Sequence, residues 1–244
     1  MLCQPYEYNQ VYIWLKNKQT CLLCDEPSDT TLCICVACEA GLPWLGEQCS
    51  RCALPLDAPS TCCRSCDQRP PAFTTVATPW RYEFVVDRLI TRFKHHSQWP
   101  LGKLLADLLG LYLQHRFDEG LQRPDALLPV PLARARLRQR GFNQSAMLAG
   151  WLGKALGLTV DERQLQRVRD TPPQQGLDAK ARRRNLAGAF ALADPASIAG
   201  RHLALVDDVL TTGTTAQLLA RQLLDAGARR VDVYCLARTP APQD

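Results

Sequence analysis

The sequence has no long hydrophobic run. None of its apolar segments reaches the roughly 18 to 20 residues of a membrane-spanning helix, and the N-terminal stretch carries Glu7 and only scattered apolar residues, without the apolar centre of a signal peptide. A membrane-inserted or exported protein is therefore not expected. The length of 244 residues suits one globular domain with a small appendage, and we expect a cytoplasmic protein with no membrane insertion.

Aromatic side chains are also scarce, at 7% of the chain, so few residues are available to stack on nucleic-acid bases. Phe142 and Trp151 are the nearest to the basic segments, and such residues lie more often in a core. The net charge of +5 is concentrated in residues 125–190. A local basic segment indicates an anionic ligand, either a phosphorylated small molecule or a nucleic-acid backbone.

Cysteine, in contrast, is abundant, with 12 residues of which ten lie between positions 21 and 66. Without an export signal, this clustering favours a metal over disulfides. Four Cys-x-x-Cys pairs begin 14 residues apart. They predict eight ligands: Cys21, Cys24, Cys35, Cys38, Cys49, Cys52, Cys63 and Cys66.

Each Cys-x-x-Cys places two thiolates on one tight turn, and two such turns complete the tetrahedral shell that zinc prefers. The eight cysteines predict two zinc sites. Grouping adjacent pairs into two ribbons is favoured over an interleaved cross-brace, and Cys33 and Cys62 are expected to be neighbours rather than ligands. Four thiolates leave no position for water, so the metal is expected to be structural and to supply folding free energy.

After the linker Arg69-Pro70-Pro71 the pattern changes to alternating strands and helices, which predicts an α/β fold with a parallel sheet flanked by helices. The expected organisation is an N-terminal extension over 1–20, a double zinc ribbon over 21–70 and the α/β domain over 71–244. We expect strands at 74–78, 126–130, 203–206 and 231–237, and helices at 82–96, 100–115, 143–156 and 214–226.

The stretch LALVDDVLTTGTTAQ, residues 203–217, carries the most specific chemistry. A buried strand is expected to end at Val206 and to place Asp207 and Asp208 outside the core, where ligands bind in such sheets. The residues Thr211, Thr212, Gly213, Thr214 and Thr215 then offer hydroxyls and backbone N–H groups at the start of a helix, which is a phosphate cradle.

Two carboxylates beside a phosphate need another partner, and ribose hydroxyls or Mg²⁺ would suit them. The residues therefore describe a sugar phosphate, with Asp207 and Asp208 at the diol and the threonine loop at the phosphate. The alternative is an acidic N-cap pair at an ordinary strand–helix turn. A P-loop is excluded because no Gly-Lys-Ser/Thr ending is present.

Two basic segments are candidates for binding pyrophosphate or DNA phosphates. The first holds Arg134, Arg136, Arg138 and Arg140 in the sequence ARARLRQRGFNQS. These arginines share one side if the segment is extended, and they form two repelling i,i+4 pairs if it is helical. The second, residues 167–185, holds Arg167, Arg169 and Arg182 around a Pro-Pro pair and resembles a lid. A solvated basic loop is the alternative for each segment.

The stretch VDDVLTTGTT resembles the phosphoribosyl pyrophosphate (PRPP) motif of type I phosphoribosyltransferases. That resemblance implies that Asp207 and Asp208 contact the ribose hydroxyls and that 211–215 contact the 5′-phosphate. With the cysteine pairs, PVPL, RGFNQ and R-x-x-N-L, the chain from Cys21 to about Arg238 resembles the ComF family, double zinc ribbon proteins with a type I phosphoribosyltransferase-like domain.

The resemblance implies a cytoplasmic protein with a PRPP and Mg²⁺ pocket that assists the handling of imported single-stranded DNA, in natural transformation or DNA utilisation, with competence-machinery proteins as partners. The alternative is an active phosphoribosyltransferase in nucleotide metabolism. Residues 239–244 are too few to form a hood that reads a base, which weakens a role in nucleobase salvage.

Overall fold

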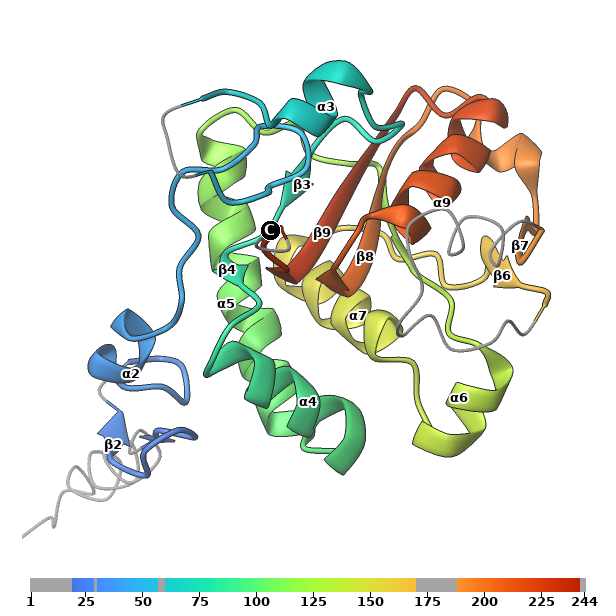
Figure 1. The fold of residues 1–244 in the computed structure, drawn as a ribbon. Helices are drawn as coiled ribbons and strands as arrows, with labels where there is room; N and C mark the ends of the chain where they lie inside the picture. Colours follow the sequence, from blue (N-terminus) through green and yellow to red (C-terminus); the bar gives the residue numbers. More distant parts are fainter. Residues whose placement is uncertain (1–18, 29, 57–59, 170–187, 242–244) are drawn as a thin grey trace, which may run out of the picture. The chain divides into compact units, whose positions relative to one another are not determined.

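The computed structural model describes residues 19–28, 30–56, 60–169 and 188–241 of the chain (Figure 1). The chain divides into two compact units, the first ending at Leu42 and the second beginning at Pro43. The boundary expected after residue 70 stays a prediction.

The first unit contains the first two Cys-x-x-Cys pairs. Strands β1 (Gln19–Thr20) and β2 (Pro27–Ser28) pair antiparallel around the first tight turn, and helix α2 (Val36–Ala40) starts directly after its N-cap, Cys35. The buried hydrophobic side chains among its described residues are Cys21, Ile34 and Leu42. So small a core leaves the cysteine cluster as the main candidate for holding this unit together.

The second unit begins with a repeat of this arrangement. Ala53 follows the third cysteine pair in a left-handed conformation (φ 52°), as Asp25 does after the first pair (φ 62°). Helix α3 (Arg64–Gln68) starts after its N-cap, Cys63, as α2 starts after Cys35. The two cysteine clusters are therefore built on the same local template.

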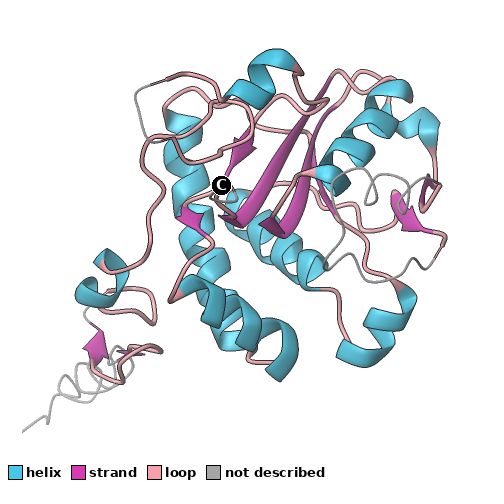
Figure 2. Ribbon diagram, viewed as in Figure 1, coloured by secondary structure: helices cyan, strands magenta, loops and turns pink. Residues whose placement is uncertain are grey.

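A five-stranded sheet forms the centre of the second unit, and all its pairings are parallel (Figure 2). Along one path the order is β3 (Val76–Ala77), β9 (Arg230–Arg238), β8 (His202–Leu210) and β5 (Ala126–Pro129), and β4 (Trp80–Arg81) also pairs with β9. The predicted parallel sheet flanked by helices is confirmed.

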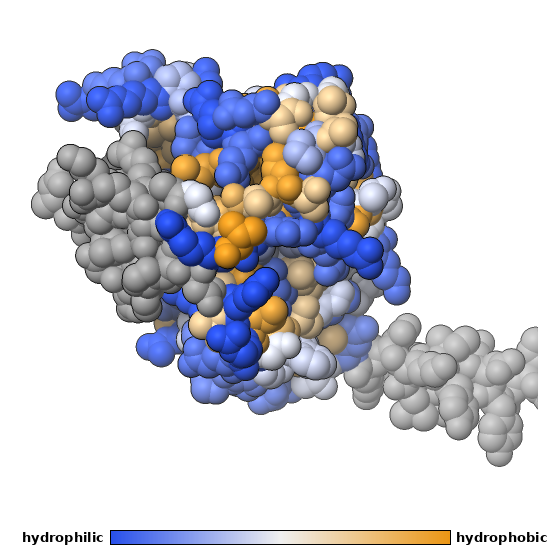
Figure 3. Space-filling model, turned by 90° about the vertical axis from the view of Figure 1, so that its right-hand side faces the viewer, coloured by the Kyte–Doolittle hydropathy of each residue, from blue (hydrophilic) through white to orange (hydrophobic). Residues whose placement is uncertain are grey.

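The flanking helices are α4 (Val86–His96), α5 (Trp99–Asp118), α7 (Gln144–Leu156) and α9 (Thr214–Asp225). Smaller elements are α6 (Arg134–Arg140), the antiparallel pair β6 (Leu165–Arg167) and β7 (Phe190–Leu192), and the 3-10 helix η1 (Pro195–Ile198). The face in Figure 3 carries hydrophobic side chains near its middle, bordered by hydrophilic ones. Within the described residues, no helix is both long and apolar enough to cross a membrane.

One hydrophobic core joins the sheet, α9 and the second cysteine cluster. Alternate residues of β8 and β9, which share a face in the parallel register, pack with leucines of α9. The cysteines of the second cluster belong to the same core: Cys49, Cys52, Cys63 and Cys66. The second cysteine cluster is thus part of the sheet's own core.

The strand that carries the acid pair is longer than expected. It was expected to end at Val206, but β8 continues through Asp207 and Asp208 to Leu210. The reason is the neighbouring strand β9, which pairs with β8 as far as Leu210↔Arg238. The two acids therefore belong to the end of a strand, and Asp208 is buried with 5% of its surface exposed.

Candidate functional site

The eight paired cysteines form two clusters of four, Cys21/Cys24/Cys35/Cys38 and Cys49/Cys52/Cys63/Cys66, with the sulfur atoms of each set within 4.8 Å of one another. Adjacent pairs group together, so the ribbon arrangement is confirmed over the cross-brace. Cys33 and Cys62 are not among the four cysteines of either cluster, as expected, although Cys62 is a close neighbour of the second, with its Sγ 3.8 Å from that of Cys49. Burial raises the pKa of the Cys235 thiol, which lies in β9 away from both clusters, to about 12.

The clusters have the dimensions of a zinc site. Sulfur atoms at the corners of a tetrahedron around zinc, with Zn–S bonds of about 2.3 Å, lie roughly 3.8 Å apart. The Sγ atoms of Cys24 and Cys35 are 3.7 Å apart, as are those of Cys52 and Cys63. Each set of four thiols could bind one zinc ion and leave it no open position.

The acid pair at the end of β8 is held by residues from two helices. Lys94 of α4 forms an ion pair with Asp208, with Nζ 2.8 Å from Oδ2. Ser145, in the first turn of α7, donates a hydrogen bond from its hydroxyl to Asp207 Oδ1 at 3.0 Å. Asn143 caps α7 by accepting from the Ser145 N–H, which fixes the start of that helix. Both acids are thus oriented from outside the sheet.

Asp207 has a raised pKa. Burial and, to a smaller extent, the neighbouring charge of Asp208 raise the pKa of Asp207 to about 7, against the opposing effect of its hydrogen bonds and Lys94. Asp207 Oδ1 accepts from both Ser145 Oγ and the Asp208 N–H. At neutral pH, Asp207 is therefore close to the midpoint of its ionisation. A bound cation or a hydroxyl that donates a hydrogen bond to it would favour the charged form.

The threonine loop directly precedes α9. Gly213 is the N-cap, in a left-handed conformation (φ 73°) that only glycine adopts without strain, and it has no side chain to cap the helix. A cavity of about 30 Å³ lies inside the loop, lined by Asp207 and by 209–216, including the first turn of α9. Unpaired N–H groups and the positive end of the helix dipole favour an anion at such a place.

A second cavity, of about 180 Å³, lies beside the acids and is lined by basic side chains. The segment of alternating arginines is the helix α6, so of the two expected geometries it takes the helical one. Of its two i,i+4 pairs, Arg136 and Arg140 line this cavity with Asp207, Asp208 and Lys94. Burial lowers the pKa of Arg140, and Asp208 counters that shift.

The other predicted anion ligands lie in different positions. Arg167 of β6 lines the cavity and its guanidinium stacks over Phe190 at 5.4 Å. Arg134 and Arg138 of α6 and the exposed Arg169 are outside the residues that line it. Arg182 and most of the predicted lid fall within 170–187, outside the described residues. Three of the seven predicted arginines are therefore brought to the acid pair.

Arg238 connects the threonine loop to the second cysteine cluster. This side chain, 7% exposed at the end of β9, donates from Nε to the Cys52 carbonyl at 2.9 Å and from Nη1 to the carbonyls of Leu210, at 3.1 Å, and Thr211. Hydrogen bonds from a charged group to buried carbonyls are among the stronger ones in proteins. The loop is thereby fixed to the cluster.

Sequence reasoning missed Lys94, Ser145 and Arg238. Lys94 had one usable signal, since it follows Ile90 by four residues at the edge of the apolar face of its helix. A lysine there needs a partner. Ser145 is near the RGFNQ motif, but nothing in its spacing indicated an acid 62 residues away. The sequence places Arg238 only as the residue after the expected strand 231–237. Its contact with Cys52 exists only once the second cysteine cluster has folded.

The chain has close similarity to named proteins. It is 38% identical to the DNA utilization protein YhgH of Salmonella typhimurium over 207 residues, which are 84% of this chain and 90% of that protein. Competence protein F of Haemophilus influenzae is 34% identical over 78% of this chain and 84% of its own length. The chain belongs to the ComF family. ComFC of Bacillus subtilis is 24% identical over 91% of this chain and 96% of its own length. No family model matches the sequence.

Solved structures with a similar fold include the purine phosphoribosyltransferase of Pyrococcus horikoshii, with a TM-score of 0.35, 17% identity, and coverage of 55% of this chain and 73% of that one. A hypoxanthine phosphoribosyltransferase of Staphylococcus aureus gives a TM-score of 0.35 at 14% identity, over 59% of this chain and 68% of that one. TM-scores this low do not support an assignment, so the interpretation of the ComF-family pocket rests on its own residues.

Proposed function

We propose that this ComF-family protein binds PRPP, or a related phosphorylated ribose, between the acid pair and the threonine loop. The observation that carries the proposal is that Asp207 lines both the basic cavity and the cavity inside the loop. Carboxylates, helix N–H groups and guanidinium groups therefore line two adjoining cavities. The ribose diol would lie at the acids, the 5′-phosphate at 211–215, and the pyrophosphate at Arg136 and Arg140.

Magnesium suits the same region, because it prefers oxygen ligands and is usually bound by one or two carboxylates together with substrate phosphates. Asp208 is already paired with Lys94. Asp207 is therefore the carboxylate that would hold the ion, and the ion would neutralise part of the pyrophosphate charge. The zinc ions, one for each cysteine cluster, would be structural.

The cellular role that we propose is the handling of imported single-stranded DNA in the cytoplasm, in natural transformation or in the use of DNA, together with competence-machinery proteins. Support comes from the names of the relatives, DNA utilization protein and competence protein. The exposed arginines Arg134, Arg138 and Arg169 extend the basic surface beyond the pocket. Such residues suit the phosphates of a DNA backbone, whose binding weakens steeply with salt.

A second candidate is transfer of the phosphoribosyl group. In that reaction the bond from ribose C1′ to the pyrophosphate oxygen breaks, a bond from C1′ to an acceptor nucleophile forms, and the nucleophile's proton leaves to solvent. Positive charge develops on the ribose and negative charge on pyrophosphate. The Asp207 carboxylate would stabilise the first and the Arg140 guanidinium the second. Release of pyrophosphate from PRPP with a panel of acceptors tests this candidate.

Calorimetric titration with PRPP and Mg²⁺ tests the pocket itself. Arg140→Gln should weaken binding about tenfold or more, because it removes charge-assisted hydrogen bonds to pyrophosphate. Arg138→Gln, on the same helix but outside the cavity, is the matched control and should stay within about twofold of the wild type. Equal affinity of the two variants, or no heat with the wild type, would contradict the proposed function.

A further inference from the structure

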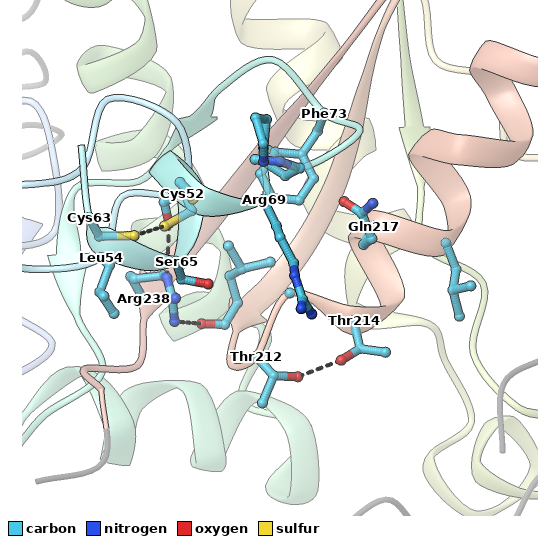
Figure 4. Close-up of a pocket in the computed structure, with 16 residues that line it drawn as sticks. Cys52, Leu54, Cys63, Ser65, Arg69, Phe73, Thr212, Thr214, Gln217 and Arg238 are labelled. Carbon is cyan, nitrogen blue, oxygen red and sulfur yellow. Dashed lines mark hydrogen bonds between the residues drawn. The ribbon is translucent and has the colours of Figure 1, made fainter. Parts of the chain in front are cut away.

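A third and larger cavity, of about 440 Å³, lies between the second cysteine cluster and the outer side of the threonine loop (Figure 4). The acid pair and the arginines of α6 are not among the residues that line it. Its volume falls within the range of about 300 to 1,000 Å³ for small-molecule sites. The PRPP site proposed above shares only the threonine loop and the adjoining Leu210 with this cavity.

The walls of this cavity are apolar and firmly held. The half-buried Pro71 and Leu218 form the accessible apolar wall, and Phe73, which is only 3% exposed, contributes little surface to it. Gln217 of α9 accepts a hydrogen bond from the Ala72 N–H at 2.7 Å, which ties the linker after the cysteine cluster to α9. Flat, apolar walls of this kind suit an aromatic ring.

The mouth of the cavity is cationic. The Arg69 side chain extends towards Thr212 and Thr214 (Figure 4), and its guanidinium has no partner in the described part of the chain. The hydroxyls of Thr212 and Thr214 are 2.9 Å apart, and no carboxylate is found among the described residues that line the cavity. A guanidinium beside two hydroxyls is a typical phosphate-binding set.

We propose that this cavity binds a nucleoside 5′-monophosphate group, with the base against Pro71 and Leu218 and the phosphate at Arg69 and the hydroxyls of Thr212 and Thr214. Cys52 and Cys63 also line the cavity. The group is either a free mononucleotide or the 5′-phosphorylated end of a DNA strand. This site is separate from the proposed PRPP site but shares the threonine loop with it.

Calorimetry with 2′-deoxyadenosine 5′-monophosphate tests the proposal on the full-length, zinc-loaded protein. Arg69→Gln should weaken binding about tenfold or more, because a charge-assisted contact to phosphate is lost. Arg64→Gln is the matched control, since Arg64 is the exposed first residue of α3, whose C-cap is Arg69, and does not line the cavity. Leu218→Trp should also weaken binding by filling the cavity, and thermal unfolding checks that each variant is folded.

Three further titrations identify what is bound. Deoxyadenosine and inorganic phosphate should each bind more weakly than the mononucleotide, because each lacks half of the contacts. A 5′-phosphorylated pentanucleotide that binds better than its unphosphorylated form would identify a strand end, and preference for the mononucleotide would identify a free nucleotide. Asp207→Asn should leave mononucleotide affinity unchanged while it weakens PRPP binding, which separates the two sites.

Several results would overturn the proposal. No binding of either phosphorylated ligand to the wild type would do so, as would equal effects of Arg69→Gln and Arg64→Gln. Binding of inorganic phosphate as tight as that of the mononucleotide would mean a simple anion site. Loss of mononucleotide binding in Asp207→Asn, with Arg69→Gln unaffected, would place the nucleotide at the acid pair.

Discussion

At the scale of single residues, the ion pair between Lys94 and Asp208 allows a charged acid to lie in a buried strand. Their side chains are 18% and 7% exposed, so the two charges are largely withdrawn from water. Removing one partner of a buried pair leaves the other charge uncompensated, which is strongly destabilising. Lys94 is therefore both a structural partner of the acid pair and part of the lining of its cavity.

Lys94→Met should lower the free energy of unfolding by about 3 kcal/mol, and Lys94→Met/Asp208→Asn should recover much of that loss because no unpaired charge remains. Lys103→Met is the control, since Lys103 forms an exposed pair with Asp107 and its loss should change stability by about 0.5 kcal/mol. Urea denaturation measures all three. A Lys94 variant as stable as the Lys103 variant would show that the pair is unimportant.

Asp207 gives a pH dependence at the same scale. Its pKa rises from 3.8 in the unfolded reference to about 7 in the fold, so the unfolded state releases its proton first as pH increases. The folded state loses stability across that window, and Asp207→Asn removes the loss. In buffer without Mg²⁺, with the zinc sites kept loaded, the melting temperature of Asp207→Asn should exceed that of the wild type by about 2 °C or more at pH 8 and by less at pH 4. The reverse order would contradict the raised pKa.

At the scale of elements, the main feature is the connection between the end of β9 and the threonine loop through Arg238. Strands β8 and β9 remain paired to their last residues, Leu210 and Arg238. The Arg238 guanidinium then continues the connection to the loop carbonyls and to Cys52. The position of the proposed phosphate cradle therefore depends on a ribbon that lies more than 140 residues earlier in the chain.

Arg238→Met should loosen that connection. The variant removes the Arg238 hydrogen bonds to the carbonyls of Cys52, Leu210 and Thr211, of which Leu210 keeps the Thr239 N–H as a donor. The loss in stability should be about 2 kcal/mol, and amide hydrogen exchange at 209–213 should become faster. Arg229→Met is the matched control because Arg229 is exposed and lies just before the same strand. Unchanged exchange in the Arg238 variant, with a faster rate elsewhere, would show that the loop is held by other contacts.

At the scale of the whole molecule, the two cysteine clusters have the same local template but different surroundings. The first lies in a unit that ends at Leu42 and has a small described core, and the second shares the core of the sheet and α9. Metal analysis should therefore give about two zinc equivalents per chain. The loss of each metal should have a different consequence.

Cys63→Ser should reduce zinc to about one equivalent and accelerate hydrogen exchange in β8 and β9, because it disrupts a cluster in the core of the sheet. Cys35→Ser should also remove one equivalent but leave exchange in those strands unchanged. The comparison is well matched, since both residues are N-caps of short helices at equivalent positions of the repeat. Equal effects of the two variants on β8 and β9 would contradict this division.

Much of this organisation could be predicted from the sequence, for identifiable reasons. Three features are local patterns that can be recognised from residue spacing alone. They are the cysteine pairs, the α/β alternation and the position of the threonine loop at the start of a helix. The length of β8 depends on pairing with β9, and the roles of Lys94 and Arg238 depend on contacts 114 and 186 residues away in the chain. Tertiary contacts of that kind leave no periodic signal.

The most direct measurement is a crystal structure of the zinc-loaded protein with PRPP and Mg²⁺. The account predicts the 5′-phosphate against the N–H groups of 211–215, the ribose diol within hydrogen-bond distance of Asp207 or Asp208, and the pyrophosphate beside Arg136 and Arg140. Electron density for PRPP elsewhere, such as at Arg69, with the acid pair still closed on Lys94 and Ser145, would contradict it.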